Sequence, residues 1–218
     1  MEKKLIQKPI NLVKVVLFGP ESTGKTTLSR QLARHYNTVW APEFARTYLQ
    51  KKWNNERKIC EKEDLIPIAI GQMKIENKLA KKADKILICD TDLLETKVYS
   101  EEYYEGFVED DLNIAATKNQ YDLYLLTYID TPWEEDDLRD RPELRLEMFT
   151  AFEKALIENK RPYILLKGDK ETRLKNAVKA IDKLVLTKEN LYSFSDSLPT
   201  SEMSLLDQIP TDSGLEIG

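Results

Sequence analysis

The chain alternates short apolar runs with longer segments in which apolar residues recur at helical spacing. The apolar runs cover residues 13–18, 38–41, 85–90, 121–127 and 162–166. Short runs rich in β-branched residues and bounded by polar or turn residues are typical of buried strands. Because a helical segment separates each strand from the next, the pattern predicts an α/β fold with a parallel sheet and helices on both faces.

The segments between these runs predict seven helices. The first expected helix begins just after residue 24. The others cover about 43–53, 64–83, 93–106, a segment that follows 106 and ends near 119, 144–159 and 173–186. The polar stretch 54–63 predicts a loop. We therefore expect one folded domain over residues 13–186, preceded by an irregular lead-in over residues 1–12. From residue 187 the composition turns to Ser, Thr, Pro and acids without periodicity, which predicts a flexible tail over 187–218.

A glycine-rich loop joins the first strand to the first helix. Residues 19–26, GPESTGKT, match the phosphate-binding pattern G-x-x-x-x-G-K-[ST]. In such a loop, glycines let the backbone N–H groups approach phosphate, the lysine contacts the β- and γ-phosphates, and the hydroxyl contacts Mg²⁺. The loop residues predicted to contact ATP are Gly19, Glu21, Ser22, Thr23, Gly24, Lys25, Thr26 and Thr27. The cofactors predicted are ATP and Mg²⁺, with Thr26 as one metal ligand.

Composition narrows the class of protein. The 218 residues carry a net charge of −5 and are 41% hydrophobic, which is ordinary for a soluble globule and argues against a general nucleic-acid binder. The two cysteines have no zinc-site or disulfide spacing, and no run approaches the ~20 apolar residues of a membrane span. We expect a cytoplasmic protein with no nucleic-acid or membrane partner. The lone histidine, His35, is expected on the surface.

Acidic residues follow the third predicted strand. Asp90 ends that strand and Asp92 lies two positions later. Because ligands bind at the carboxyl ends of parallel strands, these carboxylates are candidates for a Mg²⁺ site or for activating a hydroxyl group. Asp92 has a structural alternative as the N-cap of the helix that begins near Leu93.

Two further segments offer candidates for substrate contact. Glu43 and Arg46 follow the second strand on one helical face, and a local ion pair is the alternative. Gln72 interrupts the apolar stripe of the third helix, where it is either a hydrogen-bond donor to substrate or a surface residue.

A charged segment follows the fourth strand. It spans residues 130–145 and contains Arg139, Arg141 and Arg145 within a short distance. That composition favours a mobile lid whose arginines approach a transferring phosphoryl group, and solvated surface charge is the alternative. Any general base must be a carboxylate, since the chain has one histidine.

Several stretches together resemble the ribosylnicotinamide (nicotinamide riboside) kinases, in particular the kinase half of NadR-type regulators of NAD synthesis. The matching stretches are GPESTGKTTL at 19–28, PEFARTYL at 42–49, IAIGQ at 68–72, DTDLLETKVYS at 90–100 and YDLYLLTYIDTPWEEDDLRD at 121–140. The resemblance implies a P-loop kinase fold with three layers, strand order 2-3-1-4-5 and a helical lid. It also implies that ATP phosphorylates nicotinamide riboside to nicotinamide mononucleotide.

The resemblance also implies roles for single residues. Glu43 and Arg46 would face the riboside, and Asp90 and Asp92 would hold the ribose or the metal. The residues implied for other roles are Trp133 for the nicotinamide pocket, Arg139 for the lid, and Gly168 with Asp169 near adenine. For catalysis we therefore predict Lys25, Asp90 and Arg139, with Asp90 the first choice and Glu43 the second for orienting the attacking hydroxyl.

The sequence departs from this family at three points. Asp137 occupies a position where the family often has glycine, about a dozen residues precede the first strand, and the H-x-G-H signature of the adenylyltransferase half is absent. We therefore expect the mononucleotide rather than the dinucleotide as product. A kinase for another nucleoside or nucleoside monophosphate, and an ATP-binding sensor without catalysis, remain as alternatives. The sequence predicts no oligomeric state.

Overall fold

The computed structural model describes residues 3–139 and 142–197, with side chains to residue 188. The chain divides into two compact units, residues 1–181 and 182–218. The first unit contains all five strands. These are β1 (Val13–Phe18), β2 (Trp40–Ala41), β3 (Ile86–Asp90), β4 (Leu123–Thr127) and β5 (Tyr163–Leu166).

The strands form one parallel sheet in the order β2-β3-β1-β4-β5. This confirms the predicted α/β class and strand order. Leu17 of β1 pairs with Asp90 of β3, so the end of β3 lies beside the point where β1 leaves the sheet. Every residue of β1, β3 and β4 is buried, which explains why these strands are almost wholly apolar in sequence.

The longer connections are helical. The helices are α1 (Lys25–His35), α2 (Phe44–Glu56), α3 (Leu65–Ala80), α4 (Leu93–Tyr103), α5 (Asp110–Lys118), α6 (Arg145–Glu158) and α7 (Lys170–Ser197). Three short 3-10 turns, η1 (Lys3–Leu5), η2 (Lys62–Asp64) and η3 (Pro142–Leu144), complete the described elements. His35 is exposed at the end of α1, as its place in the sequence predicts.

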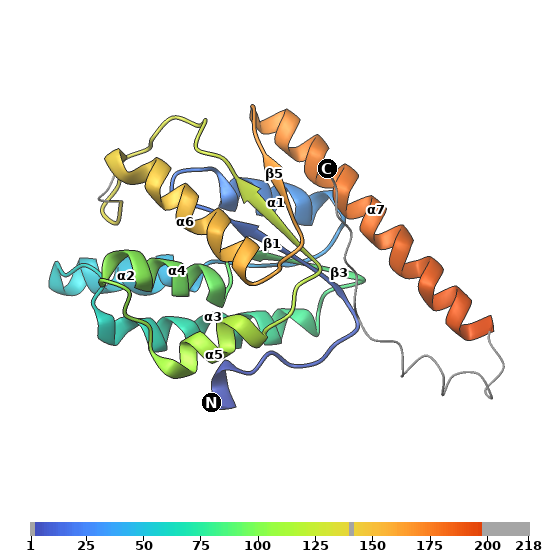
Figure 1. The fold of residues 1–218 in the computed structure, drawn as a ribbon, viewed down its shortest axis with the longest axis horizontal. Coiled ribbons are helices and arrows are strands. Elements are labelled where there is room, and N and C mark those ends of the chain that lie inside the picture. Colours follow the sequence, from blue (N-terminus) through green and yellow to red (C-terminus); the bar gives the residue numbers. More distant parts are fainter. Residues whose placement is uncertain (1–2, 140–141, 198–218) are drawn as a thin grey trace. The chain divides into compact units, whose positions relative to one another are not determined.

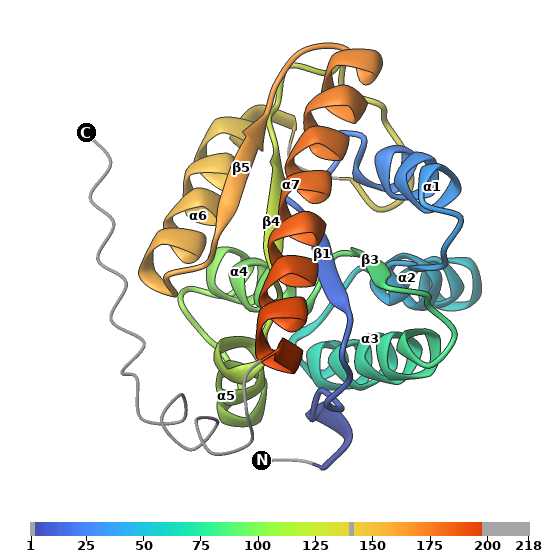
Figure 2. The same cartoon turned by 90° about the vertical axis from the view of Figure 1, so that its right-hand side faces the viewer.

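Helices cover both faces of the sheet. On one face α4 packs against α3, α5 and α6 (Figure 1). On the other face α1 packs against β1 and β3, and the first part of α7 lies beside it (Figure 2). The Tyr36 hydroxyl after α1 donates to the Val178 carbonyl of α7 at 3.2 Å, which joins these two helices. The predicted arrangement of helices on both faces is therefore observed.

A charged group lies inside the sheet at the end opposite the glycine loop. The Lys14 ammonium on β1 is 3.3 Å from a carboxylate oxygen of Glu76 on α3, and both side chains are buried. The hydroxyl of Tyr121 donates to the other oxygen of Glu76 at 2.7 Å. Because its charge is paired and hydrogen-bonded, Lys14 is accommodated within an otherwise apolar strand.

Several element boundaries differ from the sequence expectation by a few residues, and two elements differ more clearly. Helix α7 continues to Ser197, so the first part of the predicted 187–218 tail is helical, and the rest lies outside the described residues. Lys, Glu and Leu after residue 186 favour helix, which explains the extension without a long apolar stripe. Strand β2 is two residues long rather than four. Across the described ranges, no helix has both the length and the apolar character needed to cross a membrane.

Candidate active site

The glycine loop lies between β1 and α1, as the sequence predicts. Gly24 has φ +83°, a conformation that side-chain-bearing residues rarely adopt, immediately before the first turn of α1. At Gly19 an added Cβ would lie 2.9 Å from the Thr127 carbonyl oxygen at the end of β4. The loop thus packs closely on β4, with its backbone held by the neighbouring strand.

Side chains of the loop hold its shape from within. The Thr23 hydroxyl donates to the Pro20 carbonyl at 2.7 Å and lies 2.7 Å from the Thr127 hydroxyl. Glu21 and Ser22 are half-buried, Thr26 is half-buried at the start of α1, and Thr27 is exposed. Among the predicted ATP contacts, Thr23 therefore has a structural role through its side chain.

Lys25 points into the loop. Its ammonium donates to the carbonyls of Gly19 at 2.6 Å and Pro20 at 2.9 Å, and it lies 3.2 Å from a carboxylate oxygen of Glu95. Burial alone would lower the pKa of Lys25, but the charges of Glu95, Glu43 and Asp90 outweigh burial and raise it. Lys25 therefore carries its positive charge at neutral pH, as a phosphate-binding lysine must.

Asp90 is buried near this lysine with no hydrogen-bond partner. Its side chain is 1% exposed, and neither carboxylate oxygen accepts a hydrogen bond from any residue in the described ranges. Burial raises the pKa of Asp90, whereas the Thr26 hydroxyl, the Lys25 charge and the Ser29 hydroxyl act against that shift. The two hydroxyls face the carboxylate but do not meet the geometry of a hydrogen bond to it. The next residue, Thr91, has φ +74°, which is strained for a β-branched side chain. A buried carboxylate without partners at a strained turn is typical of a ligand-binding position.

The arrangement of Asp90 and Thr26 fits a magnesium ion. Mg²⁺ is commonly held by one or two protein oxygens together with substrate phosphates and waters. Asp90 offers two buried oxygens without other partners, and the Thr26 hydroxyl lies near them. Within the described residues, no group of three or more His, Cys, Asp or Glu side chains has the arrangement of a metal site. The fit is therefore to a cation shared with phosphate.

Asp92 is the N-cap of α4. One carboxylate oxygen accepts from the Glu95 backbone N–H at 3.0 Å, and the other accepts from the Tyr124 hydroxyl at 2.7 Å. Burial raises the pKa of Asp92 to about 6. Of the two roles that the sequence leaves open for this residue, the observed contacts are those of the helix cap, and Asp92 is 1% exposed.

Two further carboxylates lie near Lys25. Glu43 lies at the start of α2, where burial raises its pKa, Lys25 lowers it and Asp90 raises it. Glu95 lies in the first turn of α4 and is 3% exposed. Glu95 was not predicted from the sequence as a site residue. It lies within the stretch LLETKVYS, whose pattern indicates only a polar position on an ordinary helix.

Gln72 is held in one orientation by α2. Its amide oxygen accepts from the Phe44 backbone N–H at 2.8 Å, and its amide nitrogen is buried without a hydrogen-bond partner in the described part of the chain. The adjacent Gly71 permits this contact, since an added Cβ there would lie 2.1 Å from the Phe44 ring. Gln72 is therefore 2% exposed rather than a surface residue, and it presents a hydrogen-bond donor.

The charged segment after β4 lies against α2. Both guanidinium NH groups of Arg46 donate to the Asp136 carboxylate, at 3.1 and 2.6 Å. Arg139 is also paired with Asp136, at 3.2 Å, and Gln50 donates to Asp137 at 3.0 Å. Arg46 and Arg139 thus meet at one acid of the segment, and Arg141 lies outside the described residues.

The same segment also contacts the glycine loop. The Ser22 hydroxyl accepts from the Glu134 backbone N–H at 2.8 Å, and the Thr131 hydroxyl donates to the Ser22 carbonyl at 2.8 Å. Trp133 lies between Thr131 and Glu134 in sequence, and its side chain is half-buried. The Arg145 guanidinium lies 5.6 Å from the Trp133 ring centroid. Residues 131–134 therefore bridge the loop to the start of α6.

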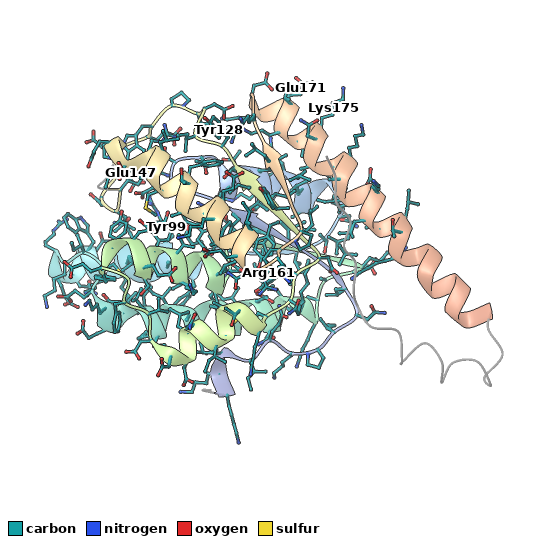
Figure 3. All side chains as sticks on the ribbon, viewed as in Figure 1. Tyr99, Tyr128, Glu147, Arg161, Glu171 and Lys175 are labelled. Carbon is teal, nitrogen blue, oxygen red and sulfur yellow. The ribbon has the colours of Figure 1, made fainter. Side chains whose placement is uncertain are left out.

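Tyrosines of α4 pack against other aromatic rings. Tyr99 lies between α4 and α6 (Figure 3), where its ring meets Phe152 at a centroid distance of 5.3 Å. It also meets Tyr103 at 5.9 Å. These edge contacts agree with the usual role of aromatic residues at helical spacing.

Gly168, which follows β5, is linked to the glycine loop by hydrogen bonds of Arg173. The Arg173 guanidinium donates to the carbonyls of Thr23 at 2.6 Å and Gly168 at 2.9 Å, and it pairs with Asp130. Asp130 in turn accepts from the Gly168 N–H at 2.7 Å. The sequence argument missed Arg173, because an arginine on an amphipathic helix gives no sign of its distant partners.

Comparisons with known proteins agree with this geometry. A family model described as an AAA domain matches residues 14–173. The chain is 31% identical over 132 residues to the trifunctional NAD biosynthesis/regulator protein NadR of Salmonella typhimurium. It is 30% identical over 157 residues to NadR of Escherichia coli K12. These matches cover 61% and 69% of this chain but 32% and 38% of the two relatives. The matched region is therefore well under half of each relative.

Solved structures give the same picture. The chain is similar to a crystal structure of NadR protein in complex with NR, with a TM-score of 0.71, 26% identity, and 80% and 52% of the two chains covered. It is similar to NadR in complex with NAD and AMP-PNP, with a TM-score of 0.67, 26% identity, and 80% and 50% covered. Deoxyadenosine kinase from M. mycoides, with a TM-score of 0.55, 16% identity, and 78% and 99% covered, shows the shared P-loop kinase fold alone.

Proposed function

This chain belongs to the AAA domain family, and on that premise we propose that it is an ATP-dependent kinase for nicotinamide riboside. The riboside 5′-hydroxyl oxygen attacks the γ-phosphorus of ATP, and the bond from that phosphorus to the β–γ bridging oxygen breaks. The products are nicotinamide mononucleotide, ADP and the proton released from the attacking hydroxyl group. The crystal structure of NadR in complex with NR, which matches 80% of this chain and 52% of the NadR chain, supports this choice of acceptor.

The observation that carries the proposal is the environment of Asp90. This carboxylate is buried without a hydrogen-bond partner in the described part of the chain, at the end of β3 and beside the loop that holds Lys25. A fold keeps such a group only where something offsets its burial, and a ligand does so in a binding site. Phosphoryl transfer needs a carboxylate at this place, either for the metal or for the hydroxyl group.

The remaining residues have roles in positioning and charge stabilisation. The loop backbone and Lys25 bind the triphosphate, and Thr26 with Asp90 would hold Mg²⁺, which neutralises charge on the phosphates. Glu43, whose pKa is raised by burial, is the second carboxylate able to orient the attacking hydroxyl. Arg46 and Arg139, which meet at Asp136, would contact the riboside and the transferred phosphoryl group.

Incubation of the purified protein with MgATP and single acceptors tests this proposal. The acceptors are nicotinamide riboside, the common ribonucleosides and deoxyribonucleosides, and the nucleoside monophosphates, with products identified by mass spectrometry. We expect turnover on nicotinamide riboside, with kcat/KM at least tenfold above that on any other acceptor. A Lys25→Met variant is the matched control and should lose roughly 10²–10³ of the turnover.

Each other outcome assigns a different function. Faster turnover on another nucleoside or on a nucleoside monophosphate would identify that compound, and not nicotinamide riboside, as the substrate. The kinase chemistry would remain as proposed. ATP binding without turnover on any acceptor would point to a nucleotide sensor. No ATP binding would overturn the proposal as a whole.

A further inference from the structure

Glu95 is a buried carboxylate in direct contact with the lysine of the glycine loop. It lies in the first turn of α4 and is 3% exposed. One of its oxygens is 3.2 Å from the Lys25 ammonium, and the other is buried without a hydrogen-bond partner in the described part of the chain. Nothing in the proposed phosphoryl transfer uses this carboxylate.

All three N–H donors of Lys25 have partners within the protein. Two of them go to the carbonyls of Gly19 and Pro20, and the third faces Glu95. A lysine ammonium has three donors and no more. A phosphate oxygen that binds Lys25 must therefore replace one of these partners, and Glu95 is the only one of the three with an ionisable side chain. Burial raises the pKa of Glu95 well above its usual range, whereas the Lys25 charge acts against that shift and favours the carboxylate form.

The backbone at Glu95 is held in place by the residues just before it. Asp92 caps α4 by accepting from the backbone N–H of Glu95 itself. Leu93 and Leu94, the two residues just before Glu95, are fully buried in the core. Because the backbone of this turn is anchored, the contact between Lys25 and Glu95 is released by rotation of a side chain and not by movement of α4.

We propose that Glu95 is a positioning residue for Lys25, which it holds against the loop backbone in competition with the nucleotide's phosphates. The carboxylate offsets much of the lysine's charge in a buried site, where charge interactions are strong. It thereby weakens the binding of ATP and ADP and sets the nucleotide affinity of the site. This inference rests on the proposed function only in taking a nucleoside phosphate as the ligand.

Other charged groups face Glu95 from the surrounding elements. Glu43 on α2 and Asp92 at the start of α4 add negative charge, and Lys25 on α1 is the only cation among its strongest charge partners. Tyr99 on the next turn of α4 interacts with it without carrying charge at neutral pH. Loss of the Glu95 charge therefore leaves Lys25 as a stronger attraction for phosphate.

Equilibrium binding of ADP and ATP, measured by calorimetry at pH 8 without any acceptor, tests the proposal with a Glu95→Gln variant. We expect the variant to bind both nucleotides about 10-fold more tightly than wild type. The KM for ATP should fall to a similar extent, whereas the KM for the acceptor should stay within twofold. Glu101→Gln, on the same helix and paired with Lys97 rather than Lys25, is the matched control for loss of one charge and should leave affinity unchanged.

A double-mutant cycle with Lys25→Met separates this pairwise effect from a general change in charge. In the Lys25→Met background, Glu95→Gln should change nucleotide affinity by less than twofold. Glu95→Met keeps the side-chain length and removes the carboxylate, so it should increase nucleotide affinity as much as Glu95→Gln does. It replaces Glu95→Gln in the test if the Glu95→Gln protein does not fold. Unchanged or weaker binding in the folded variant would overturn the proposal, and so would an equal effect in both backgrounds.

These results distinguish failure of the inference from failure of the proposed function. If the wild-type protein binds no nucleotide, both fail. If it binds nucleotide and Glu95→Gln has no effect, Glu95 does not position Lys25 but kinase function stands. If the acceptor proves to be another nucleoside, the binding measurements keep their meaning, since they contain no acceptor.

Discussion

Burial of the Asp90 carboxylate costs free energy, and the residue lies at the candidate active site. Its carboxylate is 1% exposed and has no hydrogen-bond partner in the described ranges, so burial disfavours its charged form. Replacement of Asp90 by Asn keeps the shape and removes the charge. We expect kcat to fall by roughly 10²–10³, whereas the free energy of unfolding should not fall. Steady-state kinetics and urea denaturation measure the two effects.

Asp84→Asn is the matched control for this prediction. Asp84 lies just before the opposite end of β3 and is exposed, so its variant should match wild type in both measurements. A stable Asp90→Asn variant with wild-type kcat would remove Asp90 from the catalytic group. A large loss of stability would instead mean that the carboxylate serves the fold.

Gln72 is a hydrogen-bond donor with its orientation fixed. Because the Phe44 N–H occupies the amide oxygen, only the amide nitrogen remains to face a ligand. A Gln72→Glu variant keeps the acceptor for Phe44 and turns the donor into an acceptor. We expect the KM for the phosphate acceptor to rise at least tenfold, since an unpaired polar group is left in a buried site. The KM for ATP should stay within twofold.

Initial-rate kinetics with each substrate varied in turn check this prediction. Gln120→Glu, an exposed glutamine just before β4, provides the control and should change neither KM. An equal rise in both KM values would mean that the variant disturbs the loop rather than the acceptor pocket. Unchanged kinetics would place the acceptor elsewhere.

The residues that sequence reasoning missed share one physical property. Glu95 and Arg173 act through partners far away in sequence, at Lys25 and Thr23. Helical periodicity predicts which face of a helix is buried, but it does not predict which distant atom a buried charge meets. The loop lysine was predictable because all its roles follow from a contiguous eight-residue pattern.

At the scale of elements, the described residues 130–139 of the charged segment contact both α2 and the glycine loop. Asp136 joins the guanidinium groups of Arg46 and Arg139, and Ser22 joins the segment to the glycine loop. The sequence predicted that arginines gather here, but not that α2 supplies one of them. A substrate that binds Arg46 therefore competes with an acid of this segment, which couples acceptor binding to the segment's position.

The connection between α2 and α3 depends on a partly buried ion pair. The Lys52 ammonium is 2.5 Å from the Asp64 carboxylate, which also accepts from the Glu61 N–H at 2.8 Å and the Tyr48 hydroxyl at 3.0 Å. Burial alone would raise the pKa of Asp64, but these contacts outweigh it and lower the pKa. Asp64 thus stabilises the folded state most where it is ionised.

We expect Asp64→Asn to lower the free energy of unfolding by about 1–3 kcal/mol at pH 7. An acid whose folded pKa is lowered contributes stability above its unfolded pKa of about 3.9 and loses it as pH falls through the folded value. The difference between wild type and variant should therefore shrink below about pH 4. Urea denaturation at pH 7 and pH 3 measures it, with Glu63→Gln, an exposed neighbour, as control. A difference that is constant with pH would show that charge is not the cause.

At the scale of the whole molecule, the strand order was predictable and several helix ends were not. Central strands with every residue buried must be apolar throughout, so β1, β3 and β4 are visible in sequence. The sheet order came from resemblance to a family, because periodicity alone gives no strand neighbours. The end of α7 was missed because helix propensity continues beyond residue 186, where the apolar periodicity fades.

Arg173 of α7 contacts three other segments, two of which are distant from it in sequence. Its guanidinium donates to backbone carbonyls of the glycine loop, of the turn after β4 and of the turn after β5, and it pairs with Asp130. It is 4% exposed. Because the planar fork of arginine satisfies several acceptors at once, lysine is not an equivalent replacement. The geometry of the phosphate-binding loop therefore depends on a residue of the last helix.

Loss of this guanidinium should affect stability and nucleotide binding together. We expect Arg173→Ala to lower the free energy of unfolding by about 3 kcal/mol, since it leaves a buried acid and several carbonyls unpaired. The KM for ATP should rise about tenfold because Thr23 loses its tether. Arg173→Lys should keep the charge yet restore less than half of either loss. Lys175→Ala, an exposed change two positions along the same helix (Figure 3), should alter neither. A destabilised Arg173→Ala variant with an unchanged KM for ATP would mean that the loop keeps its phosphate-binding shape without this contact.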